Sequence, residues 1–592
     1  MTAAEIRADL APNPASYMKA RRRIVPEAGG LRALRLAVLS TYTANILEPF
    51  LFVEAALRGL KLESWFGPFG QLEQPALEDG GELYQHAPDV VLVLAQLDDL
   101  LPGAMPRFLT LDAAAQQTAL GEVRARLSNL LATLRARTGA ILLVANFPPP
   151  AVAAASLADA GLAASQTTFT QQASAIVADV CRGIPAAFVF DYARLVAGEG
   201  LRHWEDARLR HLARVPFGVP GQIAFAKLLA RTLRAAVQPP AKVLVLDLDE
   251  TLWGGIVGED GPGGIQLGDD YPGSVFKDFH RYILSLRDRG ILLAIASKNN
   301  EADVEEVFAT NRECLVKRGD FSAVRINWER KSVNIAAIAS ELNLGLDAFV
   351  FFDDNPAERE EVRVALPMVR VIEVPDEPIG YIAAIEESGE FDTLSISAED
   401  RTRAGAYQAL ATAADFHAAS PEDFLRSLDM KVTVGPVDAM TLPRVVQLLG
   451  KTNQFNLTTR RHSEADVQRM IAAGAVALWV RAGDRFGDHG LIAVAIAVPE
   501  AGACWRVDSL LMSCRVIGRC VETVLLAQLS AEVARRGGTR LIGEYVATPK
   551  NAQVATFYPD NNFAPAGAGK WERDIVTAPL ESPSFIRVEV LP

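Results

Sequence analysis

The first 238 residues alternate continuous apolar runs with longer amphipathic stretches. The apolar runs cover residues 35–40, 89–97, 139–147 and 186–192, and amphipathic stretches such as 114–138 separate them. Strands that are apolar at every position are typical of a parallel sheet that is covered on both faces. The pattern predicts an open α/β domain, in which ligands bind at the carboxyl ends of the strands.

The next part of the chain repeats this pattern more sharply. Apolar strands that each end in a polar cluster are predicted at 242–251, 291–299 and 348–356, and helices at 274–290, 301–311 and 332–344. Because the carboxyl ends of parallel strands lie at one edge of a sheet, we expect the polar clusters to converge there.

Proline-rich segments mark the predicted domain boundaries. Pro239 and Pro240 end a helical pattern, and residues 373–378 hold two further prolines. After a polar helical connector at 379–428, a β-branched segment at 430–437 opens the last domain. The prediction is an α/β chain of three domains: an open α/β sheet at 1–238, a Rossmann-like parallel sheet at 239–378 and an α+β domain at 429–592.

The composition fits a folded protein of several domains. The chain has 592 residues, half of them hydrophobic, and a net charge of −13. Its basic tract Lys19–Arg23 is short, so nucleic acid is not expected as a partner. The five cysteines, an odd number without a C-x-x-C pair, argue against a disulfide framework or a zinc knuckle. The polar N-terminal segment and the lack of a bilayer-spanning apolar run predict a cytoplasmic protein that does not bind membranes.

The first strand of the central domain ends in Asp247-Leu-Asp249-Glu-Thr251. The two aspartates face the same side of the strand, and their carboxylates repel each other unless a cation lies between them. The last strand of this domain ends in Asp353 and Asp354. Carboxylate oxygens suit Mg²⁺, so the sequence predicts a magnesium site at this edge of the sheet.

Two further side chains in the central domain suit a phosphate group. Ser297 ends the second strand and Lys331 precedes a helix, and a hydroxyl and an ammonium both donate hydrogen bonds to phosphate oxygens. A carboxylate can attack a phosphoryl group while a second acid protonates the leaving oxygen and later activates water. The central domain therefore contains the parts that phosphoryl transfer needs.

These motifs resemble those of the haloacid dehalogenase (HAD) superfamily of phosphatases: Asp247-x-Asp249-x-Thr251, Ser297, Lys331 and Asp353-Asp354. The resemblance implies Asp247 as nucleophile and metal ligand. It implies Asp249 as general acid and base, with its backbone carbonyl on the metal. The threonine, serine and lysine would hold the phosphoryl group, and one acid of the last pair would complete the Mg²⁺ site.

Longer stretches resemble the FkbH-like branch of the superfamily, subfamily IIIC: DLDETLWGGIVGEDG (247–261), SKNNEADV (297–304), FFDDNPAERE (351–360), KTNQFNLTTRR (451–461), DRFGDHGLIAV (484–494) and LLMSCRVIGR (510–519). This resemblance implies a bifunctional glyceryltransferase and phosphatase. Such an enzyme takes a phosphoglyceryl unit from 1,3-bisphosphoglycerate, removes the phosphate, and loads the glyceryl group onto an acyl carrier protein for polyketide-type assembly.

Residues 505–546 predict a strand, a turn, a long amphipathic helix and a strand. The turn places Arg515, Gly518 and Arg519 at a helix start, where free N–H groups and guanidiniums suit an anion. With TPKNAQVATFYPDNNF (548–563), this region resembles GNAT-type acyltransferases, although Cys520 stands where that family has Gly or Ala. The resemblance implies a groove for coenzyme A or for the phosphopantetheine arm of a carrier protein.

Cys514 lies within the FkbH-like motif and is the candidate for carrying the acyl group. A thiol near a helix N-terminus and beside Arg515 should have its thiolate favoured. His489 is a candidate base for that thiol. The alternative for Cys514 is a small buried hydrophobic residue.

In the first domain, Ser40 and Asn146 end strands, and Ser40 stands where the nucleophile of SGNH-type hydrolases does. The Asp-x-x-His pair of that family is missing, because Leu209 stands three residues after Asp206 and His211 five. Without this base the serine lacks activation. The resemblance implies a degenerate SGNH-like domain for docking or substrate shaping, with an active esterase as the alternative.

Three hypotheses for the function follow. The first is a Mg²⁺-dependent phosphatase coupled to acyl transfer, with 1,3-bisphosphoglycerate and a carrier protein as partners. The second is a stand-alone phosphatase whose outer domains recognise a small phosphorylated metabolite or sugar. The third is a non-catalytic scaffold for a carrier protein, which the complete set of HAD motifs argues against.

Overall fold

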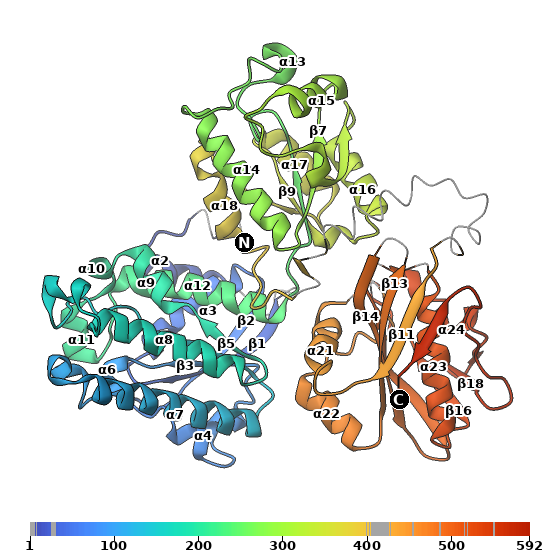
Figure 1. Cartoon of the computed structure of the whole chain (residues 1–592), viewed down its shortest axis with the longest axis horizontal. Coiled ribbons are helices and arrows are strands. Elements are labelled where there is room, and N and C mark those ends of the chain that lie inside the picture. Colours follow the sequence, from blue (N-terminus) through green and yellow to red (C-terminus); the bar gives the residue numbers. More distant parts are fainter. Residues whose placement is uncertain are drawn as a thin grey trace. The chain divides into compact units, whose positions relative to one another are not determined.

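The computed structural model describes residues 6, 9–24, 31–397, 400–401, 403, 426, 428–452, 455–484, 487–513, 516–517, 519–548 and 551–591. The chain divides into two compact units, Met1–Gln238 and Pro239–Pro592. The first unit holds one sheet and the second unit holds two (Figure 1). Two sheets are parallel and the third is mixed, so the predicted α/β fold class is confirmed. In the described ranges, no helix has the length and apolar character needed to cross a membrane.

The sheet of the first unit is parallel throughout, with the order β2-β1-β3-β4-β5. Its strands are β1 (Arg32–Ser40), β2 (Leu60–Phe66), β3 (Val90–Leu94), β4 (Ile141–Ala145) and β5 (Ala187–Phe190). Four of them were predicted. The strand β2 was missed because it lies at the sheet edge, where only part of its residues are buried and no continuous apolar run is required.

Helices surround this sheet as expected for continuous apolar strands. They are α2 (Pro14–Arg23), α3 (Glu48–Ala56), α4 (Gln74–Leu77), α5 (Glu82–Gln85), α6 (Leu97–Leu100), α7 (Ala113–Arg137), α8 (Gln166–Arg182), α9 (Tyr192–Glu199), α10 (Leu201–Trp204), α11 (Ala207–Ala213) and α12 (Val219–Val237). The long helices α7 and α8 share one apolar core with β1, β3 and β4. Asp112 starts α7 by accepting a hydrogen bond from the N–H of Ala115 at 2.8 Å, which satisfies a free donor of the first turn.

The second sheet is also parallel, with the order β10-β9-β6-β7-β8. Its strands are β6 (Val243–Leu246), β7 (Leu292–Ser297), β8 (Phe321–Ile326), β9 (Phe349–Phe352) and β10 (Arg370–Val371). The strand β8, an edge strand with partly buried positions, was not predicted. Since β6 lies between β9 and β7, the residues that follow these three strands meet at one edge of the sheet.

Helices cover both faces of this second sheet. They are α13 (Val257–Asp260), α14 (Gly273–Asp288), α15 (Glu301–Thr310), α16 (Lys331–Glu341), α17 (Pro356–Ala365) and α18 (Tyr381–Ser388). One apolar core joins the sheet to α14 and α15, and another joins it to α16 and α17. The residues 404–425 of the predicted helical connector lie outside the described residues.

The third sheet is mixed, with the order β17-β18-β16-β15-β14-β13-β11-β19 and with β12 paired to β15. Its strands are β11 (Lys431–Pro436), β12 (Phe455–Asn456), β13 (Val476–Asp484), β14 (Gly487–Pro499), β15 (Cys504–Met512), β16 (Arg540–Glu544), β17 (Ala564–Pro565), β18 (Lys570–Asp574) and β19 (Arg587–Val590). The accompanying helices are α21 (Leu442–Lys451), α22 (Glu464–Ala472), α23 (Val521–Arg535) and α24 (Phe557–Asp560).

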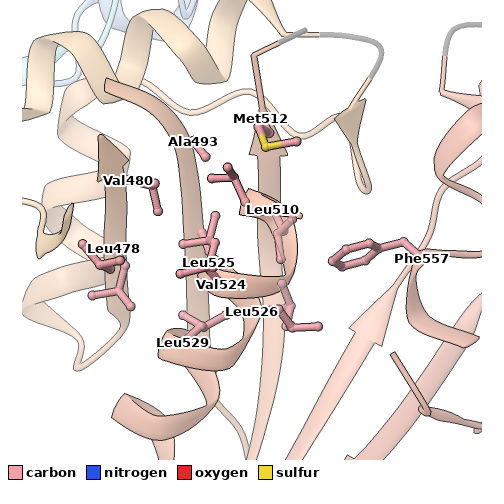
Figure 2. Packing of buried hydrophobic residues seen from close by; sticks show 14 of the residues in the cluster. Leu478, Val480, Ala493, Leu510, Met512, Val524, Leu525, Leu526, Leu529 and Phe557 are labelled. Carbon is pink, nitrogen blue, oxygen red and sulfur yellow. The ribbon is translucent and has the colours of Figure 1, made fainter. Parts of the chain in front are cut away.

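Helix α23 packs its apolar face onto this third sheet (Figure 2). Val524, Leu525 and Leu529 of the helix are fully buried against side chains such as Val480 and Leu510 of the strands. Each fully buried side chain of this size contributes about 1.5–3 kcal/mol to folding. This packing holds α23 against the sheet.

Candidate functional site

Three carboxylates converge at the carboxyl edge of the second sheet. Asp247 directly follows β6, and Asp353 and Asp354 directly follow β9. The two strands are hydrogen-bonded neighbours, and their last residues, Leu246 and Phe352, are paired. Oxygen atoms of the three carboxylates therefore lie within 4.8 Å of one another.

Lys331, the first residue of α16, lies among these acids with only 2% of its side chain exposed. Its Nζ is 2.8 Å from Asp247 Oδ2 and also forms an ion pair with Asp353. Burial by itself would lower the pKa of this lysine, but the two carboxylates outweigh burial and raise it. The lysine is therefore held as a cation inside the site.

One lysine does not balance three carboxylates. Burial, followed by repulsion from Asp247, raises the pKa of Asp353 above its usual range. The same two causes raise the pKa of Asp354 to about 6. A second positive charge would relieve this repulsion.

The donor set fits a hard divalent cation. Asp247 Oδ1 is buried and has no hydrogen-bond partner in the part of the chain that the structure describes, although a buried acceptor without a partner costs about 1–3 kcal/mol. Cations of this type bind carboxylate oxygens and keep several waters. Asp247, Asp353 and Asp354 are therefore the residues that could hold the metal. Which acid of the last pair binds directly stays open, as in the prediction.

Asp249 lies outside this cluster, and its side chain is held by three donors. The indole N–H of Trp253 at 2.8 Å and the backbone N–H of Val257 at 3.1 Å donate to Oδ1. The amide of Asn299 donates to Oδ2 at 3.0 Å. The metal contact expected for Asp249 involves its backbone carbonyl and stays a prediction.

Trp253 and Asn299 are site residues that the sequence reasoning missed. Trp253 is completely buried and Asn299 is 5% exposed. Both stand within the motif stretches DLDETLW and SKNN, so the available signal was their proximity to Asp249 and Ser297 in sequence. The hydrogen bond from Asn299 to Asp249 became visible only when β6 and β7 were placed side by side. Trp253 is four residues from Asp249, and its hydrogen bond is local.

The two predicted hydroxyl residues lie at the same edge of the sheet. Ser297 is 1% exposed, and its Oγ accepts a hydrogen bond from Asn299 at 3.1 Å. Thr251 donates from Oγ1 to Asp354 at 3.1 Å. All the side chains predicted from the four HAD-like motifs are thus brought to one edge.

In the third sheet, His489 forms a buried cluster with Asp484 and Arg519. His489 Nε2 lies 2.8 Å from Asp484 Oδ2 and 3.2 Å from Arg519 Nη1, and the guanidinium also pairs with Asp484. The side chain of His489 is 4% exposed, and its Nδ1 is buried without a hydrogen-bond partner among the described residues. In the tautomer that carries its proton on Nε2 and donates it to Asp484, Nδ1 is the atom that can accept a proton.

The remaining predicted residues of this part are Cys514, Arg515, Gly518 and Arg519. Cys514, Arg515 and Gly518 lie outside the described residues. Arg519 is described, but it is buried and neutralises Asp484. Its expected contact with an anion therefore stays a prediction.

A second carboxylate–imidazole pair in this part was not predicted. His462 Nε2 lies 2.7 Å from Asp508 Oδ2, and Arg460 and Arg506 bind Asp508 Oδ1 at 3.2 and 3.1 Å. Burial would raise the pKa of Asp508, but these hydrogen bonds and charges lower it to about 2. The cluster ties the segment after β12 to β15.

In the first unit, the residues considered for an SGNH-like site form hydrogen bonds within the unit. Ser40 is buried, and its Oγ accepts a hydrogen bond from the N–H of Tyr42 at 3.1 Å. Asn146 donates to Asp191 at 2.8 Å, and Asp206 caps α11 by accepting from the N–H of Leu209 at 2.9 Å. These contacts are structural and supply no base for the serine.

Comparison with known proteins supports the phosphatase-like part. No protein-family model and no curated protein matches the chain. The N-terminal part of the protein BF1531 from Bacteroides fragilis, which contains a phosphatase domain and was crystallised in complex with Mg, is similar with 26% identity and a TM-score of 0.56. The match covers 64% of this chain and 99% of that chain. This share is larger than either compact unit, so the similarity extends across both.

Similarity to acetyltransferases is confined to about a quarter of the chain. A GNAT-family acetyltransferase from Staphylococcus aureus is 5% identical, covers 24% of this chain and 99% of its own, and has a TM-score of 0.20. The ribosomal-protein-S18-alanine N-acetyltransferase from Escherichia coli is 15% identical, covers 24% of this chain and 88% of its own, and has a TM-score of 0.19.

The fold, the acidic edge and the similarity to BF1531 together define a phosphatase-like domain.

Proposed function

We propose that the chain is a Mg²⁺-dependent phosphatase of the HAD type that is coupled to acyl transfer. The observation that carries this proposal is the cluster of Asp247, Asp353 and Asp354 around Lys331, with Asp247 Oδ1 left without a hydrogen bond. The similarity to a Mg-complexed phosphatase domain supports it. When bound, Mg²⁺ would neutralise the carboxylates and the incoming phosphoryl oxygens.

The residues of the site suit a two-step phosphoryl transfer. Asp247 attacks phosphorus to form an aspartyl-phosphate, while Asp249 gives a proton to the leaving oxygen and then removes one from the attacking water. Lys331 and Ser297 hold the phosphoryl oxygens. The three donors on Asp249 keep its carboxylate in one orientation for both proton transfers.

For acyl transfer, we propose Cys514 as the thiol and His489 as its base. The sulfur attacks the carbonyl carbon of the acyl phosphate in 1,3-bisphosphoglycerate, Nδ1 of His489 takes the thiol proton, and the carbon–oxygen bond to phosphate breaks. The phosphatase site then removes the remaining phosphate, and the glyceryl thioester passes to the phosphopantetheine thiol of an acyl carrier protein. The buried, unpaired Nδ1 of His489 supports this role.

Intact-protein mass spectrometry tests the coupled reaction. The enzyme is incubated with Mg²⁺ and enzymatically generated 1,3-bisphosphoglycerate, without carrier protein, and the adduct is mapped by peptide. We expect a glyceryl adduct on Cys514 in the wild type and a phosphoglyceryl adduct in Asp247→Asn. Cys514→Ser should form neither, whereas the control Cys520→Ser should behave as wild type, because burial and Glu522 raise the pKa of the Cys520 thiol. An adduct elsewhere, or none in the wild type, contradicts the proposal.

A stand-alone phosphatase is the second candidate, and a specific observation favours it. Every described side chain of the acidic site comes from the second sheet and its helices, so phosphoester hydrolysis needs no residue from the third sheet. In that case Asp247→Asn abolishes the release of phosphate from a small phosphorylated metabolite or sugar. Cys514→Ser then leaves turnover unchanged, and no protein adduct forms.

A further inference from the structure

The loop between β8 and α16 is fixed beside the phosphatase site. The backbone N–H of Asn327 donates to the carbonyl of Ser297 at 3.1 Å. The side-chain oxygen of Asn327 accepts hydrogen bonds from the N–H of Glu329 at 3.0 Å and from the amide of Asn334 at 2.8 Å. These bonds hold the loop in one conformation next to the carboxyl end of β7.

Trp328 stands exposed on this loop. Its side chain is 71% exposed, yet its indole N–H donates to the side-chain oxygen of Asn300 at 3.3 Å. The preceding residue, Asn299, donates to Asp249. A large ring that is open to solvent is thus anchored, at its polar edge, to the residue next to Asn299, which contacts the predicted acid and base.

Arg330 is an exposed cation on the same loop as Trp328. It is the residue before Lys331 and caps α16, and no ion pair or side-chain hydrogen bond of Arg330 is found among the described residues. Two other basic side chains in this part of the described chain, one after β7 and one in α17, are engaged. Lys298 pairs with Glu358 at 2.6 Å, and Arg359 donates to the carbonyl of Asp353 at 2.8 Å.

We propose that Trp328 and Arg330 select the substrate of the phosphatase site, which is a phosphomonoester whose leaving group carries a second oxyanion. The guanidinium binds that carboxylate or phosphate, since its planar fork of N–H donors matches oxyanions. The indole ring covers the carbon chain between the two anions. This inference rests on the second candidate function, the stand-alone phosphatase, and adds the class of substrate to it. The phosphoglyceryl thioester of the coupled reaction carries no second anion.

Matched substrate pairs test this selection. 3-Phosphoglycerate and glycerol 3-phosphate differ by a carboxylate in place of a hydroxymethyl group, and fructose 1,6-bisphosphate and fructose 6-phosphate differ by a phosphate. We expect kcat/KM in Mg²⁺ to be about 10-fold or more higher for the member with the second anion in at least one pair. The pair that shows the preference identifies the anion as carboxylate or phosphate.

The variant Arg330→Ala should remove this preference. It should leave kcat/KM unchanged for the member of each pair that has a single anionic group. Arg330→Lys should restore only part of the preference, because an ammonium lacks the fork of donors. Arg312→Ala is the matched control, since Arg312 is also exposed but follows the far end of α15. Trp328→Ala should raise KM about 5-fold or more for both members of a pair, while Trp328→Phe retains most of the contact.

The outcomes separate this inference from the function on which it rests. If none of the four compounds is hydrolysed, the inference fails, and release of phosphate from a generic phosphoester in Mg²⁺ decides whether the stand-alone phosphatase stands. If members of both pairs are hydrolysed equally well and Arg330→Ala changes nothing, the phosphatase stands and the selection is wrong. An unchanged KM in Trp328→Ala would overturn the role of the ring.

Discussion

The substitution Trp253→Phe tests whether the hydrogen bond from Trp253 to Asp249 is needed for catalysis. It deletes the indole N–H that donates to Asp249 Oδ1 at 2.8 Å and keeps an aromatic ring in a completely buried position. A hydrogen bond to a charged group contributes about 1.5–3 kcal/mol. If this bond is needed in the transition state, its loss lowers kcat by about 10- to 150-fold.

The same substitution also removes core volume, so its effect on folding needs a control. A smaller ring at this site should lower the free energy of unfolding by about 1–2 kcal/mol. Phe308 packs edge-on against Trp253, with ring centroids 6.3 Å apart, and takes no part in the site. Phe308→Leu should therefore cost a similar free energy of unfolding while leaving kcat unchanged.

The assay is release of phosphate from a generic phosphoester in Mg²⁺, combined with urea unfolding of each variant. Asn299→Ala, which removes the donor at 3.0 Å from Asp249 Oδ2, should lower kcat by a comparable factor. A kcat for Trp253→Phe within twofold of the wild type, in a folded protein, would refute the reasoning. An equal loss of kcat in Phe308→Leu would show that packing, and not the hydrogen bond, controls the rate.

Three further predictions concern stability. Lys331→Met leaves the buried carboxylates without their cation and should lower the free energy of unfolding by about 3–5 kcal/mol in a chelator. Adding Mg²⁺ should raise the melting temperature of this variant more than that of the wild type, and equal increases would contradict the prediction. Asp508→Asn should cost about 2–3 kcal/mol at neutral pH, because the folded pKa of about 2 lies below the unfolded value of about 4; the difference from wild type in urea unfolding should shrink as the pH falls from 4 towards 2, and a constant difference would argue against it. Gly543→Ala would place a Cβ 2.3 Å from the buried ring of Tyr558 and should lower the melting temperature, whereas Gly450→Ala meets no atom within 4 Å and, being in a helix, should raise it slightly; equal shifts for the two variants would refute the clash.

The candidate phosphatase site was largely predictable because its residues are marked locally in the sequence. A polar residue that ends or directly follows an apolar strand must lie at the strand end, and Asp247, Ser297 and Asp353 are three such positions on neighbouring strands. Edge strands were harder to predict. In β2 and β8, positions that are not fully buried interrupt the apolar run that marks the central strands.

The α/β class, the central parallel strands and the residue types of the acidic edge follow from local sequence, because burial on both faces requires unbroken apolar runs. The hydrogen bonds between distant residues follow from the fold and not from any local segment. The fold brought Asn299 to Asp249 and Asp484 to His489, and it left Asp247 Oδ1 without a donor. These contacts depend on strand order and helix packing, which no local pattern of hydrophobic and polar residues specifies.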